Sequence, residues 1–382
     1  MLSRSAADHE HRRRIVVVSH SCVLAANQQV YASFADLGWD VTILVPGRWP
    51  SEYIGGYHPP ETARGLEGRV HGLRVLFAGR PARHAYVGFL ARRLRRLRPD
   101  VLLIEQEPFV ISAFQWAWAA HRARVPYGVT QYENRTAAVD RTIVVRRLMA
   151  RLLRNAAFVV ARSPTAMNLA RSWGARNVIR VIPPALARSA GAQRREATRE
   201  PVFCVGFVGR LVPEKGVHIL IEALRQLAPP LRLLVIGDGP LRSDLEAFDG
   251  GGFTVGVITG VRHDDVALHL DQLDVLCLPS LTTERWAEQF GRVLIEATAR
   301  GVPVIGSDSG EIPWVIEQTG GGFVVSEGDA SALADAIARL RDDDALRRRL
   351  SEEGARTTID FCSAESCAAQ LNSLLQEAVP NL

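Results

Sequence analysis

Residues 203–224, FCVGFVGRLVPEKGVHILIEAL, carry the pattern that decides the fold. The apolar run at residues 203–208 predicts a buried strand, and apolar positions at helical spacing in residues 217–227 predict a helix. Gly209 ends the strand, and Gly216 opens the helix. A strand that passes through a short turn into a helix is the repeating element of parallel α/β sheets.

The same alternation of strands and helices extends in both directions from this stretch. Further strands are predicted at residues 14–19, 41–45, 101–104, 127–130, 157–161, 178–182, 232–236, 275–278 and 303–305. Further helices are predicted at residues 28–37, 109–122, 292–300, 330–340, 345–351 and 364–378. Strands separated by helices imply parallel, doubly wound sheets. We therefore expect an α/β protein with two tandem Rossmann-like domains that face a cleft.

The domain boundary is expected near the middle of the chain. At about 100–200 residues per domain, 382 residues suit two domains. Residues 188–200 lack periodicity and mix charged residues with Gly and Ala, which is typical of a linker. The predicted domains are residues 1–187 and 201–363, followed by an amphipathic helical segment at residues 364–382. Ligands of such folds bind in the cleft at the carboxyl ends of the strands.

The composition argues against several classes of protein. Hydrophobic residues make up 47% and charged residues 23% of the chain, which is unlike a disordered or fibrous protein. No stretch approaches the ~18 consecutive apolar residues of a membrane-spanning helix, and the apolar run at residues 15–18 is too short for a signal peptide. The five cysteines contain no CxxC pair and suit reduced thiols better than disulfides or a zinc site. We therefore expect a cytoplasmic protein.

The charge is distributed unevenly along the chain. Residues 1–190 contain 28 Lys and Arg against 12 Asp and Glu, whereas residues 191–382 contain 18 against 29. The basic half is expected to attract an anionic partner. Residues 91–98 and 146–154 are basic and amphipathic at helical spacing, which fits either peripheral docking on the inner face of an anionic membrane or a solvated helix face. Nucleic-acid binding is not expected, because no recognition motif accompanies the charge.

Lys215 is the only lysine among the 46 basic residues of the chain. Arg210 directly follows the strand that ends at Gly209, and Lys215 directly precedes the helix opened by Gly216. Two cations and a helix N-terminus at the carboxyl end of a strand form a site for an anion such as phosphate. A compact ammonium group acts on phosphate as a point charge, whereas a guanidinium group is bulkier and directional. This difference would explain why a lysine stands here in a chain that otherwise uses arginine. The alternative is a solvated Arg210 beside an ordinary turn lysine.

A second segment, PSLTTERWAEQFGRVLIEATARGVPVIGSDSGEIPWVI, supplies two glutamates. Glu288 stands at the junction between a loop and a helix, and Glu296 follows a little over two helical turns later. Both carboxylates can accept hydrogen bonds from ligand hydroxyl groups, with the N–H groups of Phe290 and Gly291 nearby. Glu296 stands in an otherwise apolar run, where a carboxylate needs a partner. A solvated helix face is the alternative.

Together these segments resemble the nucleotide-sugar site of the large retaining glycosyltransferase family numbered four, which has the GT-B fold. The resemblance covers residues 203–325 densely and is looser in the first half of the chain, where it rests on residues 19–46 and 98–109. It rests on four blocks in a fixed order, GR with EKG at residues 209–216, VIGDGP at residues 235–240, LPS at residues 278–280 and EQFG with EA at residues 288–297.

The resemblance implies catalytic roles for three charged residues. Arg210 and Lys215, with Gly209 beside them, would bind the donor diphosphate and stabilise it as the leaving group. Glu288 would hold the donor sugar. Retention without a covalent intermediate and without a metal is the family's usual account, and no Asp-x-Asp metal motif is evident in the sequence. The three aspartates at residues 342–344 fall between predicted helices and are interpreted as a helix cap.

The resemblance also implies the remaining donor contacts and the course of the last helix. That helix, at residues 364–382, would cross back onto the first domain. The remaining donor contacts are Gln289 and the backbone N–H groups of Phe290 and Gly291 for the sugar, Glu296 for the ribose, and the backbone around Val261 and Arg262 for the base.

Polar residues that follow the strands of the first domain are candidates for the acceptor side, with ordinary surface residues as the alternative. A lone histidine at a strand end, such as His20, is also typical of a structural residue. The loop LAAN at residues 24–27 lacks the two glycines common in the family, and residues 183–187 and 310–314 also depart from its pattern. These departures leave the acceptor open. The acceptor-side candidates are His20, Asn27, Glu105, Glu107, Glu133 and Asn134.

The leading hypothesis is a retaining, metal-independent glycosyltransferase. It would move a sugar from a nucleoside-diphosphate sugar, UDP- or GDP-linked, to an acceptor hydroxyl group, with the nucleotide sugar as co-substrate and no further cofactor. A small metabolite, a lipid-linked glycan and a polysaccharide are all open as acceptors. Two alternatives are a nucleotide-sugar epimerase of the same architecture and a non-catalytic protein that binds nucleotide sugars.

Overall fold

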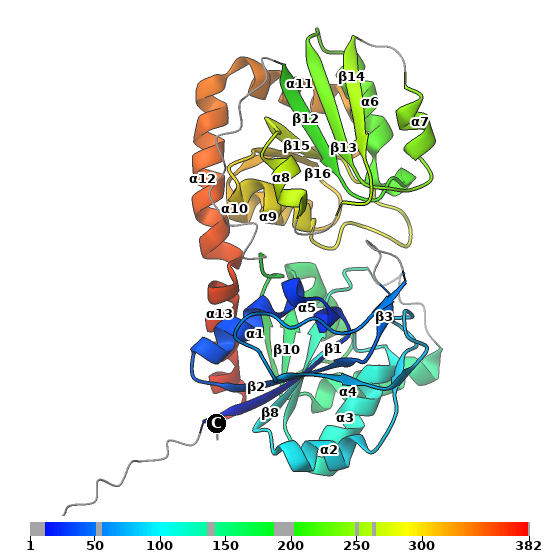
Figure 1. Ribbon diagram of the computed structural model, residues 1–382, viewed down its shortest axis with the longest axis vertical. Helices are drawn as coiled ribbons and strands as arrows, with labels where there is room; N and C mark the ends of the chain where they lie inside the picture. The colour runs from blue at the N-terminus through cyan, green and yellow to red at the C-terminus, as the bar shows by residue number, and fades with distance from the viewer. Residues whose placement is uncertain are drawn as a thin grey trace, which may run out of the picture.

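The protein consists of two α/β lobes, each built on a parallel sheet (Figure 1). The computed structural model describes residues 12–50, 56–135, 142–186, 202–248, 252–261 and 265–380. The predicted linker at residues 188–200 lies outside the described residues, so its bounds stay a prediction. The predicted α/β class, with two parallel sheets in tandem, is confirmed.

The sheet of the first lobe has seven parallel strands in the order β11-β10-β9-β8-β1-β2-β5. The chain passes from β1 to β2 on one side and continues from β8 to β11 on the other, so the strand order reverses between β1 and β8. Loops diverge at such a reversal and leave a crevice at the carboxyl ends of the strands. The strands are β1 (Arg14–Ser19), β2 (Asp40–Pro46), β5 (Val70–Leu73), β8 (Val101–Glu105), β9 (Tyr127–Gln131), β10 (Phe158–Ala161) and β11 (Val178–Val181).

Helices cover both faces of this sheet. Side chains alternate between the faces, so Ile15 and Val17 of β1 enter one buried core while Val16 and Val18 enter the other. The helix α1 (Gln29–Asp36) and the last helix of the chain lie over the first core. The helices over the second core are α2 (Leu90–Leu97), α3 (Ile111–Ala123), α4 (Ile143–Asn155) and α5 (Pro164–Ser172).

The sheet of the second lobe has six parallel strands in the order β14-β13-β12-β15-β16-β17. Its strand order reverses between β12 and β15, which pair directly. The strands are β12 (Phe203–Val208), β13 (Leu231–Ile236), β14 (Phe253–Ile258), β15 (Val275–Leu278), β16 (Val304–Ser307) and β17 (Gly322–Val325). The helices are α6 (Val217–Arg225), α7 (Arg242–Glu246), α8 (Val266–Leu270), α9 (Arg292–Ala299), α10 (Ile312–Thr319) and α11 (Ala330–Asp342).

Two helices at the end of the chain join the lobes. The long helix α12 (Asp344–Cys362) runs down one side of the molecule, and α13 (Ala364–Ala378) then packs against α1, β10 and β11 of the first lobe (Figure 1). Trp39 Nε1 donates a hydrogen bond to Asn372 Oδ1 of α13 at 2.9 Å. The predicted helix at residues 345–351 was too short. Side chains continue to be buried at helical spacing through Gly354 and Thr358. Gly354 packs so closely that a Cβ there would lie only 2.9 Å from the Cα atom of Gly321.

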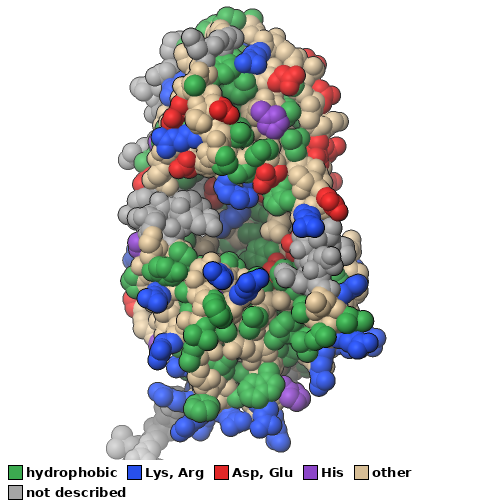
Figure 2. All heavy atoms as spheres, turned by 90° about the vertical axis from the view of Figure 1, so that its right-hand side faces the viewer, with side chains coloured by type: hydrophobic (Ala, Val, Ile, Leu, Met, Phe, Trp, Pro, Cys, Tyr) green, Lys and Arg blue, Asp and Glu red, His purple; other side chains and the backbone are tan. Residues whose placement is uncertain are grey.

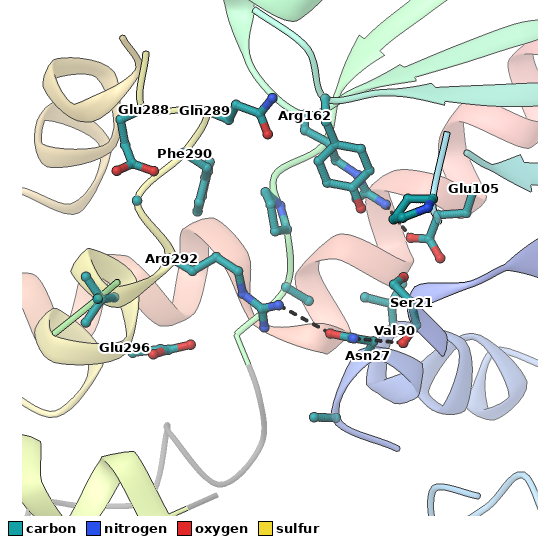
Figure 3. Close-up of a pocket in the computed structure, with 18 of the residues that line it drawn as sticks. Ser21, Asn27, Val30, Glu105, Arg162, Glu288, Gln289, Phe290, Arg292 and Glu296 are labelled. Carbon is teal, nitrogen blue, oxygen red and sulfur yellow. Dashed lines mark hydrogen bonds and ion pairs between the residues drawn. The ribbon is translucent and has the colours of Figure 1, made fainter. Parts of the chain in front are cut away.

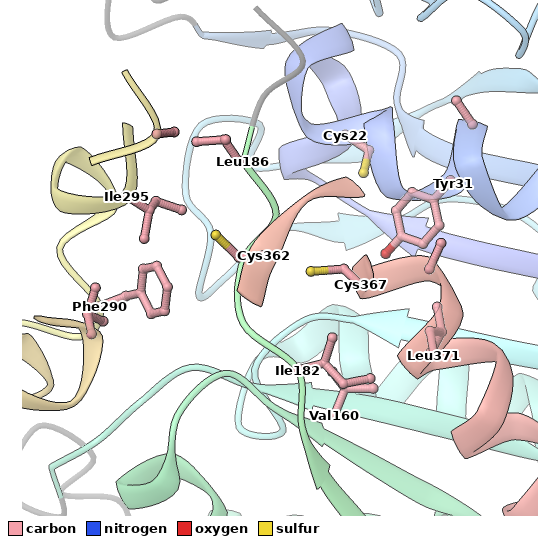
Figure 4. Close-up of a cluster of buried hydrophobic side chains, with 14 of the residues drawn as sticks. Cys22, Tyr31, Val160, Ile182, Leu186, Phe290, Ile295, Cys362, Cys367 and Leu371 are labelled. Carbon is pink, nitrogen blue, oxygen red and sulfur yellow. The ribbon is translucent and has the colours of Figure 1, made fainter. Parts of the chain in front are cut away.

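A single apolar cluster passes from one lobe to the other beside the junction of α12 and α13 (Figure 4). Phe290 and Ile295 enter it from the second lobe, and Tyr31 and Ile182 enter it from the first. All five cysteines are free and buried, in agreement with the predicted reduced thiols. None of the described helices combines the length and apolar character that a bilayer crossing needs.

The smaller elements lie near the carboxyl ends of the strands and in the connections of the first lobe. The 3₁₀ turns are η1 (Ser21–Val23), η2 (Ala25–Gln28) and η4 (Pro213–Lys215). The short strand pairs are β3 (Trp49–Pro50) with β4 (Tyr57–His58) and β6 (Val75–Leu76) with β7 (Ala85–Tyr86).

Candidate functional site

A cleft of about 1120 Å³ lies between the lobes. It is lined by loops at the carboxyl ends of both sheets, including the loops after β1, β8, β12 and β15. Figure 2 shows the hollow between the lobes, with basic side chains inside it. Lys215 and Glu296, which the sequence places in separate segments, line the same cleft.

Lys215 is positioned by a turn that packs tightly against the end of β15. The residue closes the 3₁₀ turn η4, and Gly216 behind it has a φ of 71°. A Cβ on Gly216 would lie 1.8 Å from the carbonyl oxygen of Pro279, so only glycine fits this approach. The backbone N–H of Leu281 donates to the carbonyl of Glu214 at 2.8 Å. The loop after β12 is thereby fixed to the loop after β15.

Lys215 and Glu288 form an ion pair in the wall of the cleft. Lys215 Nζ lies 2.5 Å from Glu288 Oε2, and Ser280 Oγ donates to the same carboxylate oxygen at 3.1 Å. The Lys215 side chain is 14% exposed and that of Glu288 10%, so each charge needs the partner it has. Lys215 Nζ also lies 5.0 Å from the centre of the Trp286 ring, within range of a cation–π contact.

The backbone of Glu288 is held from both lobes. Its carbonyl oxygen accepts hydrogen bonds from Glu311 N at 3.0 Å and from Asn134 Nδ2 of the first lobe at 2.9 Å. A Cβ on Gly310 would lie 2.1 Å from the same oxygen, so this glycine is needed for the close approach. Asn134, predicted on the acceptor side, therefore anchors the loop that carries Glu288.

The other predicted donor residues also lie on the cleft. Arg210 is exposed at the end of β12, whereas Glu296 is buried on α9. The helix α9 begins after Gly291 with no side-chain cap on its N-terminus, which leaves that end to a ligand or water. Of the predicted base contacts, Val261 lines the cleft and Arg262 lies outside the described residues. The described donor-side residues on the cleft are Gly209, Arg210, Lys215, Val261, Glu288, Gln289, Phe290, Gly291 and Glu296.

His20 lies at the first-lobe wall within a group of aromatic rings. Its Nδ1 lies 3.0 Å from Gln106 Oε1, and its ring centre lies 5.2 Å from that of Trp49 and 5.4 Å from that of His84. Burial, together with the neighbouring His84, lowers the pKa of His20 to about 4. The imidazole is therefore neutral near pH 7.

Glu105 forms an ion pair inside the first lobe. Its Oε1 accepts from Arg162 at 2.8 Å, and its Oε2 accepts from the thiol of Cys22 at 3.3 Å (Figure 3). Both charged side chains are buried. A buried pair of this kind fixes β8 to the end of β10 and holds the carboxylate, although the residue still lines the cleft.

Glu107 presents one carboxyl oxygen that has no partner among the described residues. Its Oε1 accepts from the backbone N–H groups of Tyr132 and Glu133, both at 2.9 Å, while Oε2 is buried and unpaired. Burial raises the pKa of Glu107 to about 8, and the nearby Glu133 acts in the same direction. The carboxyl group therefore keeps its proton to a higher pH than a solvated glutamate does, and it adds little negative charge to the first-lobe wall.

Sequence reasoning missed a contact that crosses the cleft. Arg292, at the start of α9, donates to Asn27 Oδ1 in the first lobe at 3.2 Å, and Asn27 Nδ2 donates to the carbonyl of Ser21 at 2.9 Å (Figure 3). The position of Arg292 directly after Gly291, at the predicted helix start, was the available signal. Gln289 Nε2 and Glu133 Oε2 approach within 3.5 Å across the same gap.

The three aspartates at residues 342–344 serve helix ends, as predicted. Asp343 caps α12, because its side chain accepts a hydrogen bond from Leu346 N at 2.8 Å. Within the described ranges, no three His, Cys, Asp or Glu side chains are grouped so as to hold a metal ion.

Comparison with known proteins assigns both halves of the chain. Residues 24–185 match the model of the glycosyl transferase 4-like domain, and residues 192–357 match that of glycosyl transferases group 1. The 2-deoxystreptamine glucosyltransferase of Streptomyces kanamyceticus is 30% identical in an alignment of 280 residues that covers 66% of this chain and 71% of that protein.

Several other curated relatives align over less than half of their length. The lipopolysaccharide core biosynthesis glycosyltransferase LpsE of Rhizobium meliloti is 34% identical over 163 residues, 42% of this chain and 45% of that protein. The chain thus spans less than half the length of LpsE. Among solved structures, sucrose-phosphate synthase from Thermosynechococcus elongatus superimposes with a TM-score of 0.70 at 20% identity, covering 97% of this chain and 100% of that one. The HepE protein of Anabaena in complex with UDP gives 0.66 at 18% identity, covering 95% and 99%. These likenesses confirm the predicted GT-B fold.

Proposed function

Since the chain belongs to the family of group 1 glycosyl transferases, we propose that it transfers a sugar from a nucleoside-diphosphate sugar to an acceptor hydroxyl group. The observation that carries this proposal is the shared cleft of Lys215, Glu288 and Glu296. The two curated relatives are both glycosyltransferases. They therefore favour neither an epimerase nor a non-catalytic binding protein.

The donor diphosphate would sit between the end of β12 and the start of α9. Arg210 and Lys215 supply two cations there, and the uncapped N-terminus of α9 adds backbone N–H groups. An ammonium group has three N–H donors, and Glu288 takes one, so Lys215 can hold phosphate oxygens at the same time. Solved structures of this fold contain UDP, UDP-glucose or ADP, which supports a nucleotide as the ligand of this protein. UDP and GDP are the proposed donor nucleotides.

The chemistry requires stabilisation of a departing diphosphate. In the proposed reaction, the bond from the sugar C1 to the phosphate oxygen breaks, and a bond from C1 to the acceptor oxygen forms on the same face. The acceptor proton passes to an oxygen of the leaving diphosphate, so no protein base and no metal are required. Fixed cations and N–H dipoles lower the barrier because negative charge grows on the diphosphate, and each such group contributes about 3–4 kcal/mol. Arg210 and Lys215 would supply most of this effect.

The acceptor would bind against the first-lobe wall. Glu107 lines this wall, and its raised pKa of about 8 keeps the carboxyl group largely protonated near pH 7, so the group adds little negative charge where the acceptor would bind. His20 is neutral near pH 7 and adds no charge to this wall. Glu105 and Asn134 are held by Arg162 and by the Glu288 carbonyl, so their proposed part is to shape the wall.

A thermal-shift panel tests the donor site directly. UDP, GDP, ADP and TDP are compared on the wild-type protein, where a ligand at 100 times its dissociation constant stabilises the fold by about 2.7 kcal/mol. We expect one nucleotide to raise the melting temperature and Lys215→Ala to remove most of that rise. Release of nucleotide on adding candidate acceptors to the matching nucleotide sugar then tests transfer. A wild-type protein that none of the four nucleotides stabilises would contradict the proposal.

A further inference from the structure

We propose that the outer surface of α2, α3 and α4 docks on a lipid bilayer that contains anionic lipids. This surface lies on the first lobe and is called the α2–α4 face below. The inference does not depend on the proposed chemistry of the cleft.

The first observation is the charge of the three helices. The helix α2 contains four arginines, α3 one and α4 four, and none of the three contains Asp or Glu. All nine guanidinium groups are exposed, and none forms an ion pair with a described carboxylate. Several arginines elsewhere in the described chain form ion pairs with nearby carboxylates. On α12, for example, Arg347 and Arg348 both pair with Asp344. The α2–α4 face therefore carries positive charge that no carboxylate of its own helices offsets.

The second observation is that large apolar side chains stand exposed among these arginines. Phe89, directly before α2, is 86% exposed, Trp118 of α3 is 62% exposed and Ile143 of α4 is 65% exposed. Ile111, Val144 and Leu148 are exposed as well. A solvated helix face would carry polar side chains at such positions, whereas a bilayer interface accepts aromatic and aliphatic groups together with cations. Figure 2 shows apolar and basic side chains gathered over the first lobe below the cleft.

The third observation is that the three helices present one continuous layer. The helix α3 packs against α2 on one side and α4 on the other, and all three cover the same buried core. Leu94 of α2 and Leu152 and Leu153 of α4 point into that core, so the arginines of both helices face outward.

Four of the exposed apolar residues lie where a helix begins. Phe89, Ile111, Ile143 and Val144 stand at the N-terminal ends of their helices. Helices in a parallel α/β lobe run antiparallel to the strands, so the N-terminal ends of α3 and α4 point toward the carboxyl edge of the sheet, whereas α2 lies at the end of the first lobe away from the cleft (Figure 1). A bilayer docked on the α2–α4 face would therefore extend along the first lobe from its far end toward the cleft.

A lipid surface fits these observations better than a nucleic acid does. Phosphates of either partner would contact the arginines, but only a bilayer offers an apolar layer for Ile143, Val144 and Trp118. We expect binding to weaken with salt, because the attraction of exposed cations is screened.

The test is co-sedimentation with lipid vesicles of two compositions, one neutral and one anionic. Wild-type protein is mixed with vesicles of phosphatidylcholine alone or of phosphatidylcholine and phosphatidylglycerol in equal parts, at low and high salt. We expect binding to the anionic vesicles and little to the neutral ones. Arg147→Glu with Arg151→Glu should weaken binding by at least about tenfold. Ile143→Ser with Val144→Ser should remove the part of the binding that survives high salt.

Matched controls keep this result specific to the α2–α4 face. Arg349→Glu with Arg356→Glu reverses two exposed arginines on α12 and should bind like the wild type. Melting temperatures close to that of the wild type show that each variant is folded. Equal binding by the wild type and by Arg147→Glu with Arg151→Glu would overturn the proposal, as would equal binding to neutral vesicles. A wild type that ignores vesicles but binds a DNA duplex through the same arginines would replace the bilayer with a nucleic acid.

Discussion

The two walls of the cleft hold their charged side chains in different ways. On the second-lobe wall, Lys215 and Glu288 meet at 2.5 Å on two loops that are themselves joined, and both face the cleft. On the first-lobe wall, Glu105 is neutralised by Arg162, and Glu107 is anchored by backbone N–H groups. The difference shows that the second wall offers a positively charged site for an anion, whereas the first wall offers shape, a few uncharged hydrogen-bonding groups and the carboxylate of Glu133.

The largest effect is expected from Lys215→Ala, which would remove the cation that distinguishes the second-lobe wall from the first. Loss of a fixed cation at the leaving group is worth about 3–4 kcal/mol, so kcat should fall by about 10²–10³-fold. Nucleotide release with donor and acceptor measures this rate. Arg242→Ala is a matched control, because Arg242 is half-exposed on α7, outside the lining of the cleft, and forms an ion pair with Glu246. Unchanged turnover in Lys215→Ala would remove the diphosphate site from the mechanism.

A smaller effect is expected from Gly216→Ala, which disturbs the turn that positions Lys215. The new Cβ would meet the carbonyl oxygen of Pro279 at 1.8 Å, in addition to the strain of a positive φ. Gly328→Ala is the control, because Gly328 has a similar φ of 74° but no atom within 4 Å of its Cβ position. We expect Gly328→Ala to lower the free energy of unfolding by about 1–2 kcal/mol and Gly216→Ala by clearly more. Equal losses, measured by urea unfolding, would mean that the contact with Pro279 is unimportant.

The second-lobe wall could be predicted from sequence because its parts are local. The motif loops that carry Lys215 and Glu288 follow β12 and β15, and these strands are neighbours in the sheet. Residue type and position within each loop therefore gave the cluster without knowledge of distant contacts. The lone lysine and the buried position of Glu296 pointed the same way.

The first-lobe wall could not be predicted in the same detail because its contacts join distant segments. Asn134 meets the Glu288 carbonyl across 154 positions, and Asn27 meets Arg292 across 265. No spacing rule connects such pairs. Also not predicted were β14 and β17, each of which contains a glycine that weakens the strand pattern, and the second half of α12. There, packing against Gly321 holds a helix through Gly354, which by itself favours an end.

The smallest effect on transfer is expected from Glu107→Gln, which sharpens the description of the first wall. Burial raises the pKa of Glu107 from 4.5 to about 8, so the folded protein holds this proton more tightly than the unfolded chain. The contribution of Glu107 to the free energy of unfolding is then fully present below about pH 4.5 and is lost as the pH rises through about 8. The amide keeps the hydrogen bonds at Oε1 and has no such titration.

Urea unfolding of both proteins from about pH 5 to about pH 9 measures this difference. As the pH rises across this window, the free energy of unfolding of the variant should increase relative to that of the wild type. The rate of transfer should change by no more than about fivefold. The titration of His20, whose pKa is 6.5 in the unfolded chain and about 4 in the folded protein, is shared by both proteins and so cancels in the comparison. A constant difference across the window would show that Glu107 is not buried as described.

The most direct measurement is calorimetry of the wild type and of Lys215→Ala with UDP and with uridine. If the thermal-shift panel selects another base, the nucleoside diphosphate and the nucleoside of that base take their place. The wild type should bind the diphosphate far more tightly than the nucleoside. In Lys215→Ala this preference should shrink by at least about tenfold, with little change in nucleoside affinity. An unchanged preference in the variant would contradict the assignment of the second-lobe wall as a diphosphate site.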